Sequence, residues 1–424
     1  MIDSQRHSRR AFLKQSRALV GGAAVATVVP SAVLGAPGKP GANNRVLIGF
    51  IGVGNRAQQL IDHVPEEGRI VAISDVYLKR AEDTLKNKKA DWPVYQDYRK
   101  MIDKERLDAV VVPTPDHGRV LPSIHACQAG LDVYAEKPLT LTIREGRALV
   151  DAVRRHKRVF QTGSQQRTME MNRFACELVC SGGIGKLRVV LGVNYGGIGP
   201  CGPRPAEPTP QGLDWAHWCG QTELVPFNNS LYRGWMGCRR YSGGQMTNWG
   251  AHGCDQIQWA LGMSQTGPVE IWPTSPGPSG AVSMRYANGV EVRYELERGP
   301  MGGGIFVGEK CKIEINRNKF TTNPPDFVKD PPEPATAQIW EGPGWIARPH
   351  IQNWLDCIKT RETPNADVEI GHRSISVCHL ANIARELGRR LRWDPERETF
   401  PGDEEANCYL QRPRRKGFEL PEPI

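Results

Sequence analysis

Two glycines and an aspartate near the start of the chain have the spacing of a phosphate-binding turn and its partner acid. Gly52 and Gly54 belong to a Gly-x-Gly-x-x-Ala run at the end of the apolar stretch RVLIGFIG, and Asp75 ends the next such stretch, RIVAISD. The glycines permit a tight turn and let the backbone approach a pyrophosphate, while a carboxylate at Asp75 can bind ribose hydroxyls. The residues predict a dinucleotide site that prefers NAD to NADP; the alternative is a phosphate held by Lys79 or Arg80.

A second set of polar residues recurs at helical spacing far along the chain. Asn248, His252 and Asp255 stand at positions i, i+4 and i+7, so in a helix they project from one face, which Trp259 extends. A histidine can accept and return a proton, whereas an amide can position a hydroxyl but cannot take its proton. Without further information a histidine in a helix is more often a buried residue with a structural role; the alternative is that His252 is an acid/base group oriented by Asp255.

The elements that position these residues change character along the chain. In the first half, strand-like runs such as LDAVVVP and DVYAEKP alternate with helical patterns at 78–87, 120–129 and 142–156. This alternation predicts an α/β Rossmann-type, doubly wound parallel sheet. Loops at the carboxyl ends of its strands, 113–117 and 136–138, are expected to line the cofactor crevice.

The second half predicts a different kind of sheet. From about residue 185 the stretches KLRVVLGVNY and AVSMRYANGVEVRYEL alternate with period two, and Asn288-Gly289 forms a hairpin turn within the latter. We expect an α+β domain with a largely antiparallel open sheet, followed by helices near 349–359 and 370–391 that pack back on the core.

Four motifs resemble those of the Gfo/Idh/MocA oxidoreductase family, and they occur in the family's order. They are PTPDH, YAEKPL, TGSQQR and GGQMTNWGAHGCD, and the likeness covers most of the chain after Arg45, including EIGHRSISVCHLANIARELGRRLRWDP near the C-terminus. The resemblance implies a Rossmann fold, use of NAD(P), a carbohydrate or polyol substrate and a homo-oligomer.

The resemblance also implies roles for individual residues. Lys137 of the EKP motif would polarise the oxygen of a secondary alcohol as hydride leaves the carbon, and burial lowers the pKa of such a lysine toward neutrality. Catalysis is assigned to Lys137, His252, Asn248 and Asp255, and substrate contact to Arg167, Asn248 and His252. The expected cofactor contacts are Gly52, Gly54, Asn55, Arg56, Asp75, Thr114, Pro115, His117, Glu136, Lys137 and Gln165. No metal site is expected.

Two positions depart from the family pattern. An acid usually stands where this chain has Asn248, which is why we assign proton transfer to His252. Arg119 follows PDHG where related exported members commonly have histidine, so the contacts on the nicotinamide side stay open. Tryptophans in GLDWAHWCG and RGWMGC offer faces on which a sugar ring can stack.

The first residues resemble a twin-arginine export signal. SRRAFLK, at 8–14, precedes a weakly apolar stretch and then small residues, which predicts export to the periplasm by the twin-arginine translocase with the cofactor already bound. An uncleaved anchor is the alternative. We therefore divide the chain into a signal peptide (1–35), a linker (36–44), an NAD(P)-binding Rossmann domain (45–165) and an α+β domain for substrate binding and oligomerisation (166–424).

Composition excludes some classes of protein. The formal net charge is +9, but five of the basic residues lie in the first 35 and the rest are interspersed with acids, which argues against nucleic-acid binding. Eleven cysteines without a CxxC pair predict unpaired thiols, as in proteins that fold in a reducing compartment.

Three functions remain open from the sequence. The first is an NAD-dependent oxidoreductase that acts on a secondary hydroxyl of a sugar, polyol or glycoside and holds its cofactor tightly. The second is a redox-neutral, NAD-dependent enzyme that cleaves glycosides by oxidation, elimination and re-reduction. The third is a sugar-binding protein with weakened catalysis, suggested by Asn248.

Overall fold

The first strand, β1 (Val46–Ile51), is buried on both faces, as its continuous apolar sequence predicts. Ile48 and Phe50 pack in one hydrophobic cluster, and Ile51 packs in another. The structure is a computed structural model that describes residues 44–332, 344 and 346–422, and the fold is that of the unit beginning at Val46. The predicted export signal lies outside the described residues.

The first sheet is six-stranded and wholly parallel, with the order β3-β2-β1-β4-β5-β6. Its strand order reverses between β1 and β4, and ligands of such sheets bind at this point, beyond the carboxyl ends of the strands. The other strands are β2 (Gly68–Ser74), β3 (Val94–Tyr95), β4 (Ala109–Val112), β5 (Asp132–Ala135) and β6 (Phe160–Thr162). Its helices are α2 (Asn55–Ile61), α3 (Leu78–Lys88), α4 (Tyr98–Lys104), α5 (Val120–Gln128) and α6 (Ile143–Arg155). The predicted doubly wound sheet is confirmed.

Helix α12 (Ala347–Thr360) returns from the C-terminal part of the chain to the first sheet. Trp354 is fully buried in the cluster of Ile48 and Phe50, and its ring meets that of Tyr134 edge-on at 5.7 Å between centroids. The expected division at residue 165 assigns α12 to the second domain, whereas its apolar face completes the core of the first.

The second sheet has eight strands in the order β13-β12-β11-β7-β10-β9-β8-β14. Only β7 and β10 pair in parallel, so the expected largely antiparallel sheet is confirmed. Its strands are β7 (Leu187–Val193), β8 (Glu270–Pro273), β9 (Val282–Arg285), β10 (Glu291–Leu296), β11 (Gly304–Gly308), β12 (Lys312–Asn316), β13 (Lys319–Asn323) and β14 (Leu391–Arg392). The remaining helices are α7 (Glu170–Cys180), α8 (Trp215–Cys219), α9 (Asn229–Arg233), α10 (Gln245–Asn248), α11 (Gly250–Ala260), α13 (Val368–Leu387) and α14 (Glu404–Asn407). None of the described helices has the length and apolar character needed to cross a membrane.

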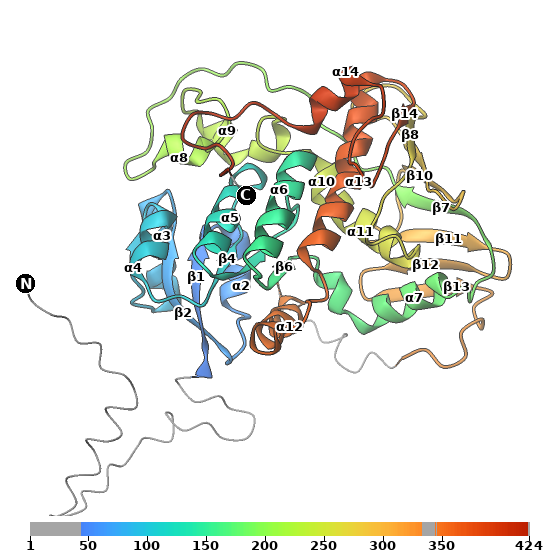
Figure 1. Cartoon of the computed structure of the whole chain (residues 1–424), viewed down its shortest axis with the longest axis horizontal. Coiled ribbons are helices and arrows are strands. Elements are labelled where there is room, and N and C mark those ends of the chain that lie inside the picture. Colours follow the sequence, from blue (N-terminus) through green and yellow to red (C-terminus); the bar gives the residue numbers. More distant parts are fainter. Residues whose placement is uncertain (1–43, 333–343, 345, 423–424) are drawn as a thin grey trace, which may run out of the picture. The chain divides into compact units, whose positions relative to one another are not determined.

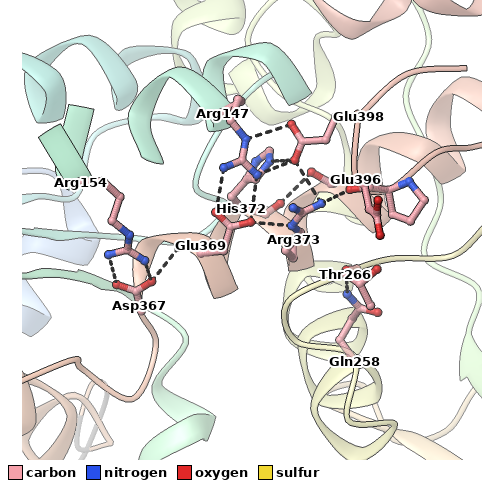
Figure 2. A network of polar contacts seen from close by, with 12 residues as sticks. Arg147, Arg154, Gln258, Thr266, Asp367, Glu369, His372, Arg373, Glu396 and Glu398 are labelled. Atoms are coloured by element: carbon pink, nitrogen blue, oxygen red, sulfur yellow. Dashed lines mark hydrogen bonds and ion pairs between the residues drawn. The ribbon is translucent and has the colours of Figure 1, made fainter. Parts of the chain in front are cut away.

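Helix α13 connects the two sheets, because it packs against α6 on one side and against α11 and β8 on the other (Figure 1). A network of ion pairs holds its first turns to α6 (Figure 2). Arg147 of α6 donates to Glu369 at 2.9 Å and to Glu398 at 2.7 Å, and His372 lies 2.6 Å from Glu398. Since Glu398 and His372 are buried, this network fixes the position of α13 against the first sheet.

Candidate functional site

A cavity of about 1110 Å³ lies at the carboxyl ends of the parallel strands. Its walls include the loops after β1, β2, β4 and β5, as expected from the sheet order. The second half of the chain contributes Asn248, His252 and Arg317 to the same cavity. The structure thus brings together residues more than two hundred positions apart in the sequence.

The glycine loop after β1 leaves room along the cavity wall. Gly52 has φ of +92°, and a Cβ there would lie 3.1 Å from the side chain of Thr114 and 3.6 Å from its Cα. A Cβ at Gly54 would meet no atom within 4 Å. Side chains at these positions would fill the space beside the backbone that a pyrophosphate needs, so the loop fits a dinucleotide.

Asp75 lies beside this loop at the end of β2 and is 4% exposed. Its carboxylate accepts hydrogen bonds from the backbone N–H groups of Val53 at 2.9 Å and Tyr77 at 2.8 Å. Arg80 lies 3.4 Å from the same carboxylate and also donates to the hydroxyl of Tyr232. The two groups that the sequence offered as alternatives, an acid and a cation, are therefore adjacent in the cavity wall.

The Lys137 ammonium points to Asn248. Nζ donates to the backbone oxygen of Asn248 at 3.1 Å and to its Oδ1 at 3.0 Å. Burial lowers the pKa of Lys137 from about 10.5 to about 8, although the carboxylates of Glu136 and Asp116 partly oppose the shift. An ammonium has three N–H donors, so one remains for a ligand oxygen.

His252 lies in the same cavity and is 5% exposed. Its side chain has no hydrogen-bond partner among the described residues, and its ring packs 5.9 Å from that of Trp249. Burial and the charges of Lys137 and Arg317 lower its pKa well below the ordinary value of 6.5. His252 is thus neutral near pH 7 and offers a nitrogen lone pair.

Asp255 does not orient His252, which corrects the expectation from helical spacing. Its carboxylate accepts from Arg167 Nε at 2.9 Å and from Ser374 Oγ at 2.6 Å, and the Arg167 guanidinium also lies over the ring of Trp259. Both Arg167 and Asp255 are buried and neither lines the cavity. Arg167, expected to contact substrate, instead joins the segment before α7 to α11.

Glu136, Arg56 and Gln165 form a linked group in the cavity wall. Glu136 Oε1 accepts from Arg56 Nε at 2.8 Å and from Gln165 Nε2 at 2.9 Å. Burial raises the pKa of Glu136, but the charges of Arg56 and Lys137 outweigh burial and lower it below its usual value. The remaining expected cofactor contacts, Asn55, Thr114, Pro115 and His117, also line the cavity.

Arg119, the departure from the family pattern, is buried and lines the cavity. It donates to the carbonyl oxygens of Thr114 and Pro138, and so connects the loop after β4 to the loop after β5. It lies 3.8 Å from Asp116, whose pKa burial raises to about 6. Arg119 therefore positions the loop that carries Lys137.

Residues 201–241, the cap segment, contribute a part of the cavity that lies outside the four family motifs. Trp215, Trp218, Phe227 and Tyr241 make a separate hydrophobic cluster there. The cap residues that line the cavity are His217, Trp218, Gly220, Gln221, Tyr232, Arg233, Trp235 and Met236. Among them, Trp218 and Trp235 come from the two tryptophan motifs proposed for sugar stacking.

A disulfide joins Cys201, at the start of the cap segment, to Cys238, near its end, with 5.0 Å between their Cα atoms. The expectation of eleven unpaired thiols is therefore wrong for this pair, and the other nine cysteines are free. Their separation of 37 residues resembles no short-range pattern, so the sequence offered no signal for the pairing.

Arg317 is the other functional candidate that sequence reasoning missed. It lies in the turn between β12 and β13, its guanidinium is 5.2 Å from the centroid of the Trp249 ring, and its Nε donates to Gln166 at 3.3 Å. Burial lowers its pKa, and the nearby charge of Arg56 adds to this effect. No motif marks this turn, since its position depends on the packing of the second sheet.

Two sequence profiles match the chain. Residues 46–164 match an oxidoreductase family with an NAD-binding Rossmann fold, and residues 202–420 match the C-terminal alpha/beta domain of the same oxidoreductase family. The two matches together cover the first sheet and every strand of the second except β7, which lies between them.

Characterised relatives match over shorter stretches. An inositol 2-dehydrogenase of Pseudomonas fluorescens is 31% identical over 145 residues, which are 33% of this chain and 43% of that enzyme. An alpha-N-acetylgalactosaminidase of Shewanella oneidensis is 28% identical over 173 residues, which are 35% of this chain and 37% of that enzyme. The chain therefore spans less than half the length of these curated relatives.

The fold matches that of solved dehydrogenases. The scyllo-inositol dehydrogenase of Lactobacillus casei with bound NAD(H) and scyllo-inositol superposes with a TM-score of 0.56 at 16% identity, over 82% of this chain and 99% of that one. At this identity the likeness concerns the arrangement of both sheets.

Proposed function

The chain belongs to the Gfo/Idh/MocA oxidoreductase family, and we propose that it oxidises a secondary hydroxyl of a sugar, polyol or glycoside with tightly held NAD. One observation carries the proposal: the ammonium of Lys137 and the free ring of His252 line the cavity that begins at the glycine loop and Asp75. NAD, when bound, supplies the acceptor for the hydride that leaves the carbon.

Two side chains act on the substrate hydroxyl, one on its oxygen and the other on its proton. The Lys137 ammonium, held by Asn248, uses its remaining N–H to polarise the substrate oxygen. His252 is neutral and without a protein partner among the described residues, so its ring nitrogen accepts the hydroxyl proton. Asn248 cannot take that proton because an amide oxygen is not basic at neutral pH.

The preference for NAD over NADP rests on Asp75. Its carboxylate would bind the ribose hydroxyls and repel a 2′-phosphate. Arg80 lies 3.4 Å from Asp75, and the acid neutralises part of its charge, which leaves Arg80 less able to attract a phosphate.

Export to the periplasm through the twin-arginine route is supported by SRRAFLK at residues 8–14. The disulfide between Cys201 and Cys238 agrees with this location, because disulfides persist in oxidising compartments. An exported enzyme has no cytoplasmic NAD pool, so we propose that the cofactor is loaded before export and retained.

Homo-oligomerisation through the open face of the second sheet is part of the proposal. Alternate residues of β10 and β13 on that sheet are exposed.

Glycoside cleavage without net oxidation is the second candidate. The alpha-N-acetylgalactosaminidase from Shewanella oneidensis, 28% identical over the stretch it shares with this chain, favours it. The same pair, Lys137 and His252, would handle the proton of the ring hydroxyl in that reaction. The two candidates differ in product, since only the first yields a ketone and reduced nucleotide.

The experiment has two parts. The full chain is purified from the periplasm without added nucleotide, and the nucleotide released on denaturation is identified by mass spectrometry; we expect NAD. The protein is then incubated with a panel of sugars, polyols and aryl glycosides while product and cofactor absorbance are followed. Ketone formation supports oxidation, and cleavage without net NADH supports the second candidate. Binding of sugars without any turnover would overturn both and leave a sugar-binding protein.

A further inference from the structure

A second cavity of about 730 Å³ lies apart from the cofactor cavity and shares no lining residue with it. It is bounded by the segment 198–201, by α13 and by residues near 408–412. Four arginines and a single carboxylate line it: Arg239, Arg240, Arg385, Arg412 and Glu386. The charged side chains of this wall therefore carry an excess of positive charge.

Two of the four arginines are neutralised by carboxylates. Arg239 lies 2.7 Å from Glu386, and Arg240 lies 2.9 Å from Glu223. Arg385 and Arg412 make no ion pair with any carboxylate of the described residues. The uncompensated charge of the wall thus belongs to these two guanidinium groups.

Arg385 is only 6% exposed. It donates to neutral acceptors, the carbonyl oxygen of Gly280 at 2.8 Å and Oδ1 of Asn194 at 2.8 Å. Burial lowers its pKa to about 10. A buried cation without a counter-charge is costly, and an anion in the adjacent cavity would offset that cost.

Arg412 approaches from the C-terminal segment. It donates to the backbone oxygen of Arg239 at 2.5 Å, and the nearby Glu145 is already paired with Arg414. A guanidinium has five N–H groups in a planar fork that matches the oxygens of a phosphate or sulfate. Arg412 therefore keeps donors that a bound oxyanion can use.

We propose that this second cavity binds a compact tetrahedral oxyanion, a phosphate or sulfate group, between the guanidinium groups of Arg385 and Arg412. The anion is either inorganic or the ester group of a sugar. The bound anion supplies the counter-charge that the described residues do not.

The segments that carry Lys137 and Asn248 also reach this cavity. Leu141 and Thr142, four and five residues after Lys137, form part of its wall, and so does Gly243, five residues before Asn248. Asn382 of α13 donates to the carbonyl oxygen of Gly243 at 2.8 Å. An anion here consequently lies beside both chain segments whose side chains meet in the cofactor cavity.

The test is titration calorimetry of the purified full chain with inorganic phosphate and with sulfate, in chloride buffer of constant ionic strength. We expect saturable binding of one anion per chain, weakened about tenfold or more in Arg412→Gln, because a charge-assisted hydrogen bond is lost. Arg106→Gln is the matched control, since it removes the same charge from an exposed position between α4 and β4, outside both cavities, and should bind like the parent. Absence of saturable binding to the parent, or equal binding to Arg412→Gln, overturns the proposal.

Sugar esters distinguish the two sources of the anion. A sugar phosphate or sulfate that binds more than tenfold tighter than the inorganic ion assigns the site to an esterified sugar, and equal affinity assigns it to the free ion.

Sedimentation of the parent and Arg412→Gln completes the test. If the parent binds no anion and the substitution changes the oligomeric state, the cavity is an interface between copies and the proposal is wrong. The titration needs no turnover, so its failure is separate from failure of the proposed oxidation.

Discussion

The ammonium nitrogen of Lys137 lies 3.0 Å from Oδ1 of Asn248, and this contact joins the loop after β5 to α10. An acidic residue in place of Asn248 would hold the lysine as a full ion pair, whereas the amide holds it by a hydrogen bond between an ammonium and a neutral acceptor. The lysine charge is consequently less stabilised, in agreement with its lowered pKa of about 8. In the proposed mechanism the acid/base function then passes to His252, which is neutral and faces the same cavity.

Replacement of the lysine tests its role directly. In Lys137→Met we expect kcat to fall by about 100-fold or more, since the polarising N–H is lost. NAD binding and the thermal midpoint should remain close to the parent, because the glycine loop and Asp75, which are proposed to hold the nucleotide, are unchanged. The control is Lys104→Met at the exposed end of α4, which should keep full activity. A Lys137→Met protein with near-parent turnover would remove Lys137 from the mechanism.

The pH dependence of turnover follows from the two pKa shifts. Lys137 has a pKa of about 8, so the polarising charge is present below that pH and is lost above it. His252 has its pKa well below 6.5 and remains able to accept a proton down to acidic pH. We expect kcat/KM for oxidation to be level near neutrality and to fall above about pH 8. A limb that rises through pH 8 would instead make neutral Lys137 the base.

An acidic residue at position 248 should shift the pH at which kcat/KM falls. Asn248→Asp places a carboxylate about 3 Å from the ammonium, which stabilises the charged lysine and raises its pKa. The fall in kcat/KM should therefore shift to higher pH by about one unit or more. Asn248→Ser serves as a control that adds no charge. An unchanged profile in Asn248→Asp would show that another group produces the limb.

Asp75 is expected to govern nucleotide choice. In Asp75→Ala the Kd for NAD should rise about tenfold with loss of the ribose hydrogen bonds. The Kd for NADP should rise less or fall, because Arg80 is freed from its acidic neighbour. Fluorescence titration of the nucleotide-free protein measures both values. Asp75→Asn keeps the size of the side chain but removes its charge. Comparison of Asp75→Asn with Asp75→Ala therefore separates the effect of the charge from the effect of losing the contacts with Val53 and Tyr77. Equal affinities of parent and Asp75→Ala for NAD would disprove the role.

A glycine in α6 should be critical for stability. A Cβ on Gly146 would lie within van der Waals overlap of the His372 ring, which is buried and bonded to Glu398. In Gly146→Ala the ring must shift and the buried pair is disrupted, at a cost of about 3 kcal/mol in the free energy of unfolding. Gly237→Ala is the control, since a Cβ there meets nothing within 4 Å. Denaturant unfolding compares the two, and equal stability would mean that the His372 network tolerates displacement.

Local sequence patterns were sufficient to predict the first sheet and many of the residues that line the cavity at its edge. Parallel strands buried on both faces leave apolar runs of four to seven residues, and the turns between strand and helix carry their own residue types. The expected loops at 113–117 and 136–138 therefore lie in the cavity wall, as do Gly52, Gly54 and Asp75. The apolar alternation of the second half likewise sufficed for a largely antiparallel sheet.

Contacts between distant segments were decided only by the tertiary structure. Asp255 follows His252 by three residues, which places the two side chains about 60° apart around a helix, and that difference turns Asp255 to Arg167 and away from the cavity. Tertiary structure alone likewise placed Arg317 in the cavity wall, paired Cys201 with Cys238, and packed α12 on the first sheet. Which side chains meet across such separations depends on how whole elements pack, and residue type and spacing along the chain do not encode that geometry.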